Sequence, residues 1–219
     1  MRIVISEFLT LDGVMQAPGG SEEDRSEGFE HGVWQLDNGY FDDVGGQVVT
    51  EAFESSDGML LGRRTYDIFA GYWPTSTEEP IAGQMNAMKK YVASTTLKEP
   101  LEWENSTLLH GDVVEAAQKL REEPGRDLQV IGSGNFAQTL MNNGLVDEYR
   151  LMIHPIVLGS GRRLFNEGHE PFQLTLLDCK TSTTGVVILS YRPLIANPPP
   201  ANRRPRAGGL PAHVQDTMR

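Results

Sequence analysis

The sequence predicts an α/β fold with a mostly parallel central sheet, an antiparallel C-terminal hairpin and helices on both faces. Three observations lead to this prediction. Short apolar runs alternate with helical patterns along most of the chain, which is typical of parallel strands buried on both faces. Glycine-containing turns join several of these strands to the next helix. Two alternating runs then follow each other directly near the C-terminus, as in a hairpin.

The first elements can be placed in order. An Ile- and Val-rich strand over 2–8 leads into an Asp12-Gly13 turn, and the long segment 16–38 is predicted to form a flap over a site. Apolar residues at helical spacing predict a helix over 41–53. A buried strand at 59–61 and a helix beginning at Gly62 complete this part of the chain.

The next elements follow the same alternation. We predict a loop over 71–83, and then strands at 89–96 and 107–110. Asp112 and Glu115 form a capping-box pattern for a structural helix that ends at Pro124-Gly125. The remaining predictions are a buried strand, turn and helix over 127–143, a long strand over 146–158 and a hairpin of 172–181 with 184–192.

Length and composition predict one domain and a tail. With 219 residues, 39% of them apolar, the chain can build a true core, and we assign residues 1–194 to that domain. Residues 195–219 are rich in Pro, Arg and Gly, so we predict a disordered tail.

Charge and cysteine content indicate which classes of partner and which cellular compartment to expect. The net charge of −11 argues against a nucleic-acid partner, and no apolar run has the length of a membrane span. The N-terminus becomes polar too soon for a signal peptide, and the single cysteine, Cys179, fits a reducing compartment. We therefore predict a cytoplasmic protein that uses a small-molecule substrate, with Cys179 buried in a strand.

The turn after the 127–130 strand is the main candidate site. Gly132 and Gly134 allow close approach to the backbone, and the amides that open the following helix favour an anion. Gly132-x-Gly134-x-x-Ala137 also satisfies a dinucleotide-binding pattern. The alternative is a tight strand-to-helix connection without a ligand.

Two further turns offer groups that bind anions. Gly62 is followed by Arg63 and Arg64 at a helix start, where cations oppose the helix dipole unless an anion is bound; otherwise the turn is simply solvated. Three hydroxyl residues, Ser94 to Thr96, follow another strand and could either donate to phosphate or cap a turn.

Three features occur together in this chain: the Leu11-Asp12-Gly13 turn, the Leu60-Leu61-Gly62-Arg63-Arg64-Thr65-Tyr66 turn, and the Val130-Ile131-Gly132-Ser133-Gly134 turn with the later 146–148 and 154–161 segments. Their combination resembles the dihydrofolate-reductase-like superfamily, in the branch of the riboflavin-biosynthesis reductase (RibD C-terminal) domain. The resemblance covers about residues 1 to 193. It implies a three-layer fold, a homodimer and NADPH as hydride donor.

The resemblance also implies roles for single residues. Gly62, Arg63, Arg64 and Thr65 would hold the pyrophosphate and 2′-phosphate side of the cofactor, and Ser94 and Thr95 would meet its adenosine phosphate region. Gly132, Ser133, Gly134, Asn135 and Phe136 would surround the pyrophosphate, and Phe8, Leu9, Asp12, Gly13 and Val14 would approach the nicotinamide.

The substrate is the point at which the sequence departs from the family. Riboflavin-pathway reductases resemble one another in a carboxylate just before the glycines, where this chain has Ile131. Dihydrofolate reductases place an acid on the first helix, where Asp42 and Asp43 lie without a matching register. Both a pyrimidine-like and a pterin-like substrate therefore stay open.

The implied function is an NADPH-dependent oxidoreductase, similar to 5-amino-6-(5-phosphoribosylamino)uracil reductase or to dihydrofolate reductase. The cofactor would supply the hydride, and the proton would come from Asp12 or from water, although Asp12 also suits a turn-forming role on the substrate side. No catalytic residue is assigned. The histidines show no metal-ligand spacing, and His154 is interpreted as a core residue. The alternatives are a dinucleotide-binding regulator without turnover and a structural dimer module.

Overall fold

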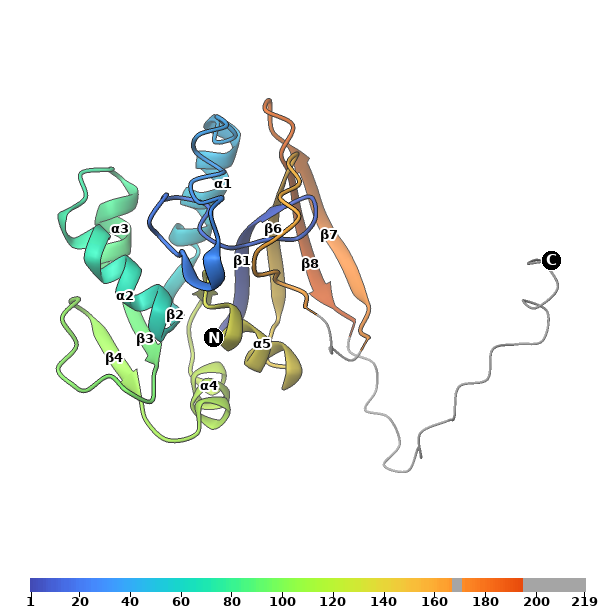
Figure 1. Ribbon diagram of the computed structural model, residues 1–219. Helices are drawn as coiled ribbons and strands as arrows, with labels where there is room; N and C mark the ends of the chain where they lie inside the picture. The colour runs from blue at the N-terminus through green and yellow to red at the C-terminus, as the bar shows by residue number, and fades with distance from the viewer. Residues whose placement is uncertain (167–170, 195–219) are drawn as a thin grey trace, which may run out of the picture.

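A twisted sheet forms the centre of the computed structural model, which describes residues 1–166 and 171–194 (Figure 1). In these residues the sheet has eight strands in the order β4-β3-β2-β5-β1-β6-β8-β7. The first six strands in this order pair in parallel, and β8 and β7 pair antiparallel. The predicted fold class is confirmed. The predicted tail, 195–219, lies outside the described residues.

The strands are β1 (Arg2–Thr10), β2 (Ser56–Gly62), β3 (Lys89–Ala93), β4 (Ser106–Leu109), β5 (Asp127–Val130), β6 (Glu148–His154), β7 (Leu174–Thr181) and β8 (Val187–Pro193). The helices are α1 (Asp43–Glu54), α2 (Arg63–Tyr72), α3 (Ile81–Ala87), α4 (Val113–Glu122) and α5 (Gly134–Asn142), with short 3-10 turns at Ser26–Gly28 and Trp73–Thr75.

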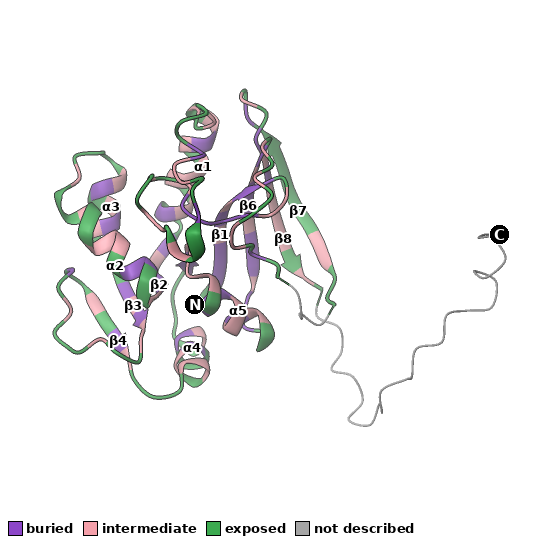
Figure 2. Ribbon diagram, in the orientation of Figure 1, coloured by how far each residue is buried: buried purple, intermediate pink, exposed green. Residues whose placement is uncertain are grey.

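Helices cover both faces of the sheet because the buried strands are apolar on both sides. Leu60 of β2 packs in a core cluster with residues of α4 and α5, whereas its neighbours Met59 and Leu61 pack with residues of α1, α2 and α3. This alternation follows from the period of two along a strand. Figure 2 shows the buried residues concentrated in the central strands.

Ion pairs occupy the amino-terminal ends of the central strands. Arg2 pairs with Asp127 at 2.8 Å, and Arg150 pairs with Glu148 at 2.7 Å and with Asp127 at 2.8 Å. This rim of the sheet is therefore occupied by its own charges. The carboxyl ends of the same strands, where ligands gather in open α/β sheets, carry the glycine turns.

Three predicted details differ from the structure. Part of the predicted 71–83 loop belongs to α3, in which Ala82 and Met85 are buried. Strand β6 ends at His154, just before Pro155, instead of continuing to 158. Cys179 is exposed, so its predicted burial was wrong: β7 is the edge strand, paired only with β8, and Figure 2 shows it largely exposed.

Of the helices in the described part of the chain, none combines the length and the apolar character that a membrane crossing requires.

Candidate functional site

The turns that follow β2 and β5 contact each other. The Gly62 amide donates to Ser133 Oγ at 2.8 Å, and the Ser133 amide donates to Thr65 Oγ1 at 2.8 Å. A Cβ at Gly132, whose φ is +59°, would lie 3.0 Å from Thr65 Oγ1, and Ser133 is itself left-handed at φ +60°. The glycine is needed at this contact because the two backbones come so close.

Helix α5 begins at this contact with free donors. Ser133 is the N-cap residue but provides no capping side-chain hydrogen bond. Among the described residues, the amides of Gly134, Asn135 and Phe136 have no hydrogen-bond partner. Unpaired amides at a helix N-terminus, together with the helix dipole, favour an anion.

Arg63 connects these turns to the one that follows β3. Its guanidinium donates to Thr96 Oγ1, and its Nε donates to Asp67 at 2.9 Å. Ser94 Oγ accepts the amides of Thr96 and Leu97, so this hydroxyl caps its own turn. Thr95 is exposed, and Thr96, the third of these hydroxyl residues, makes the contact with Arg63.

Arg64 points in the other direction, to the predicted flap. It lies 3.4 Å from Asp24 Oδ2 and donates to Ser26 Oγ at 3.1 Å. Arg162, which follows β6, also pairs with Asp24. Asp24 therefore bridges two cations from separate elements, and its pKa is lowered: burial raises it, but hydrogen bonds from Ser26 and the charges of Arg162 and Arg64 outweigh burial.

Ala17, Phe29 and Trp34 of the flap form a small hydrophobic cluster with Val14, which lies just before the flap. Gln16, which is 4% exposed, donates to the carbonyls of Asp24 and Ser26. Its Oε1 accepts the Arg162 amide at 3.0 Å. Segment 16–38 is thus attached to the segment after β6, and its role as a flap over a site stays a prediction.

Asp12 holds a turn. Its carboxylate accepts hydrogen bonds from Thr10 Oγ1 at 2.6 Å and from the amides of Leu158 and Gly159, and it pairs with Arg163 at 3.3 Å. Burial raises the pKa of this carboxyl, but these hydrogen bonds outweigh burial and lower it to about 2. The arrangement favours the turn-forming role over the substrate-side role.

The residues predicted to approach the nicotinamide line the base of the flap. Leu9 and Val14 are buried in core clusters, and Phe8 packs edge-on against His154 with ring centroids 5.9 Å apart. His154 Nδ1 lies within hydrogen-bonding distance of the Leu9 and Met152 carbonyls, but Nε2 has no partner among the described residues. Burial lowers the pKa of His154. Its interpretation as a core residue agrees with this position.

Asp42, one of the two acids at the start of the first helix, makes structural contacts. Asp42 is the N-cap of α1 and accepts the Gly45 amide at 2.9 Å, and its other oxygen accepts the amide and hydroxyl of Thr183. These bonds lower its pKa. They bind Asp42 to the β7–β8 turn.

Glu7 is the residue at this rim that we had not assigned. It lies in β1, is 7% exposed, and its Oε1 has no hydrogen-bond partner among the described residues. Burial raises its pKa well above the ordinary value, although hydrogen bonding to the Gly132 amide opposes this, and the charge of Glu23 adds to the increase. An acid within a strand predicted to be buried was the available signal.

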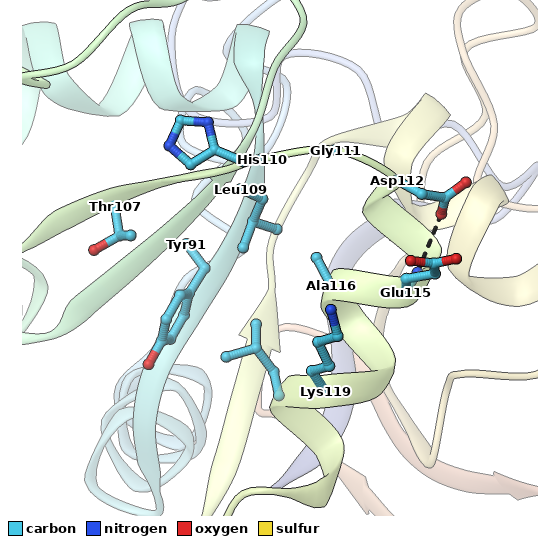
Figure 3. A pocket seen from close by; sticks show the side chains of 10 residues that line it. Tyr91, Thr107, Leu109, His110, Gly111, Asp112, Glu115, Ala116 and Lys119 are labelled. Atoms are coloured by element: carbon cyan, nitrogen blue, oxygen red, sulfur yellow. Dashed lines mark hydrogen bonds between the residues drawn. The ribbon is translucent and has the colours of Figure 1, made fainter.

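A separate hollow of about 420 Å³ lies between β3, β4 and the start of α4 (Figure 3). Tyr91, Thr107 and His110 line one side, and Asp112 and Glu115 line the other. Asp112 already accepts the amides of Val114 and Glu115, so its carboxylate occupies the helix N-terminus. None of the predicted site residues lines this hollow.

Two bacterial proteins are similar to this chain in sequence. The uncharacterized protein YyaP of Bacillus subtilis (strain 168) is 30% identical over 195 residues, which are 87% of this chain and 94% of that protein. The uncharacterized protein YwjB of the same organism is 25% identical over 168 residues, covering 76% and 83% of the two chains.

Solved structures share the fold. A putative riboflavin biosynthesis protein from Shewanella sp. PV-4 superposes with a TM-score of 0.63 at 21% identity, covering 88% of this chain and 99% of that one. A pyrimidine reductase-like protein from Corynebacterium diphtheriae gives 0.58 at 13% identity, covering 88% and 92%. The model of the RibD C-terminal domain matches residues 2–188. The chain therefore belongs to the RibD C-terminal domain family.

Proposed function

We propose that this protein is an NADPH-dependent reductase of a small heterocyclic substrate, pyrimidine-like or pterin-like. One observation carries the proposal: the turns after β2, β3 and β5 are joined at one rim by the Arg63–Thr96, Gly62–Ser133 and Thr65–Ser133 hydrogen bonds. Family membership supports a reductase. The names of the solved relatives, a putative riboflavin biosynthesis protein and a pyrimidine reductase-like protein, support this substrate class.

The residues present fit the phosphates of NADPH. The free amides of Gly134, Asn135 and Phe136 would hold the pyrophosphate, and Gly132 would let it approach the backbone. Arg63, which contacts the turn after β3, would hold the 2′-phosphate that distinguishes NADPH from NADH. Arg64, which points to the flap, would face the pyrophosphate. In this proposal Ser94 and Thr95 would contact the adenosine phosphate region of the cofactor.

NADPH supplies a hydride when it is bound, so the protein has to bind, orient and shield the reactants. The 16–38 flap, which Gln16 and Asp24 attach to Arg162, would cover this rim and exclude water. Asp12 has a pKa of about 2 and has no proton to give at neutral pH. The proton would then come from water.

The Arg63→Ala and Arg64→Ala variants test the phosphate assignment. Arg63→Ala should weaken NADPH binding by about 1.5–3 kcal/mol, roughly 10- to 150-fold, and leave NADH binding nearly unchanged, whereas Arg64→Ala should weaken the binding of both dinucleotides. Arg192→Ala is the matched control, because Arg192 is exposed on β8. Fluorescence titration of each variant with both dinucleotides measures the effect. Equal losses for NADPH and NADH in Arg63→Ala would contradict the assignment, and binding of neither dinucleotide to the unmodified protein would refute the proposal.

Turnover separates a reductase from a dinucleotide-binding regulator. Dihydrofolate and 5-amino-6-(5-phosphoribosylamino)uracil represent the two substrate classes. Oxidation of NADPH that requires one of them would support the enzyme and select its substrate class. Tight NADPH binding with no oxidation in the presence of either would favour the regulator.

A further inference from the structure

Glu7 lies at the point where β1 loses one of its neighbours. The pairing of β1 with β5 ends at Ile5 and Val130, whereas its pairing with β6 continues to Thr10 and His154. Continuing the β1–β5 register by two residues would place Glu7 opposite Gly132, where the chain has turned towards α5. The influence of the Gly132 amide on the Glu7 carboxyl agrees with this placement.

The side chain points to the α5 side of the sheet. Ile5 and Leu9, which flank Glu7 at the strand period of two, both belong to the core cluster that contains residues of α4 and α5. Glu7 is thus a carboxyl set among apolar neighbours, more than nine-tenths buried, with Oε1 unpaired in the described residues. A buried polar atom without a partner is costly and suggests that a ligand supplies the missing group.

The acidic group that faces Glu7 belongs to the flap. Glu23 accepts the amides of Gly19 and Gly20 at 2.9 and 3.0 Å, and its own pKa is raised by burial. Its charge raises the pKa of Glu7 in turn, which adds to the effect of burial. Burial and this charge both act in favour of the neutral form of the Glu7 carboxyl, which has both an O–H donor and a carbonyl acceptor.

The order of the strands gives the direction of a bound dinucleotide. Under the proposed function, on which this step rests, the 2′-phosphate lies at Arg63 beside β2 and β3, and the pyrophosphate lies at the start of α5 beside β5. Since the sheet order is β3-β2-β5-β1, the nicotinamide end then reaches β1. Glu7 is the buried acid at that end.

We propose that Glu7 recognises the carboxamide of the nicotinamide. The carboxamide N–H would donate to the unpaired Glu7 oxygen, and the Glu7 O–H would donate to the carboxamide oxygen. An acid and a primary amide satisfy each other in this way, so the pair would remove the unpaired atom. Glu7 would be a binding residue that orients the ring that donates the hydride.

Binding measurements alone test this pairing, with changes made in both the protein and the cofactor. NADP⁺ is compared with its 3-acetylpyridine analogue, in which a methyl group replaces the carboxamide NH₂. The unmodified protein should bind NADP⁺ about 3- to 10-fold more tightly than the analogue, as expected for one hydrogen bond. In Glu7→Leu this preference should fall to less than about twofold, whereas Glu7→Gln, which keeps a donor and an acceptor, should retain it.

Glu23→Gln is the matched control, because it neutralises the neighbouring acid and leaves Glu7 in place; it should keep the preference for NADP⁺. An unchanged preference in Glu7→Leu, or no preference in the unmodified protein, would overturn the role of Glu7 while leaving the reductase proposal intact. Failure of the unmodified protein to bind NADP⁺, NADPH or the analogue would overturn both. If Glu7→Leu does not fold, loss of the preference in Glu7→Gln would contradict the pairing and its retention would support it.

Discussion

Asp12 illustrates how a residue that suits catalysis in the sequence can be structural in the fold. Its carboxylate collects hydrogen bonds from Thr10, Leu158 and Gly159, and these join the end of β1 to the segment after β6. The Asp-Gly pair was sufficient to predict the turn. Leu158 and Gly159 lie 146 and 147 residues away along the chain, so the sequence could not reveal these two partners.

Replacing Asp12 should destabilise the protein. Asp12→Asn removes a charged acceptor of two backbone amides, and we expect a loss of about 1–3 kcal/mol in the free energy of unfolding at pH 7. Because the folded-state pKa is lowered to about 2, this contribution is present above the unfolded pKa and disappears as the pH falls towards 2. Urea unfolding at pH 7 and at about pH 2.5, inside that range, measures the loss. Asp178→Asn, at an exposed Lys180 pair, is the control and should change stability by less than about 0.5 kcal/mol.

Glu7 should produce the opposite pH dependence. The pKa of Glu7 is raised in the folded state. Its contribution to the free energy of unfolding is therefore largest below the pKa of the unfolded state, and it is lost as the pH rises through the pKa of the folded state. Across that window the unmodified protein should lose up to about 1.4 kcal/mol per pH unit relative to Glu7→Gln. Unfolding curves of both proteins between pH 4 and 9 provide the comparison. Parallel pH profiles would show that Glu7 titrates normally.

At the scale of elements, the flap combines backbone strain with polar fastening. Three of the five non-glycine residues with positive φ in the described chain, Ala17, Glu27 and Val33, lie within 16–38. Such conformations persist only where the surroundings enforce them, and they are frequent at functional sites. Asp24, with its two arginine partners, is the main charged contact between this segment and the rim.

Neutralising Asp24 should loosen the flap. In Asp24→Asn the amides of residues 16–38 should exchange hydrogen about 5- to 30-fold faster, equivalent to about 1–2 kcal/mol of lost local stability. Hydrogen-exchange mass spectrometry gives the rates. Glu22→Gln breaks only the exposed Arg25 pair in the same segment and serves as the control. Similar exchange rates in the two variants would mean that Asp24 does not fasten the flap.

The sequence predicts some elements better than others, for physical reasons. The parallel strands and the helix after Asp112 could be predicted because burial on both faces and N-capping leave local patterns. Helix α3 was missed because it is short and lies among prolines and glycines. Cys179 was misplaced because an edge strand resembles a buried strand when only its own residues are considered.

At the scale of the whole molecule, the glycine turns could be predicted, but their partners could not. Gly62, Gly132 and the arginines are recognisable because they mark strand-to-helix turns. The Arg63–Thr96 and Arg64–Asp24 contacts depend on the strand order and on the path of the flap. Glu7 was visible as an acid in an apolar strand, but only the termination of β5 at Val130 gives it a place in the site.

The quaternary structure stays a prediction. The homodimer implied by the family would have to cover surface that one chain leaves exposed, and the edge strand β7 presents Leu176 and Leu177 at about half exposure. Light scattering on the purified protein measures the number of copies.

The central claim is that the turns after β2, β3 and β5 hold one dinucleotide, and hydrogen exchange with and without NADPH tests it most directly. Bound NADPH should slow exchange at 62–65, 94–96 and 134–136 together, and leave the hollow at 110–115 unchanged. Slowed exchange at 110–115 alone, or no change anywhere at saturating NADPH, would contradict the account.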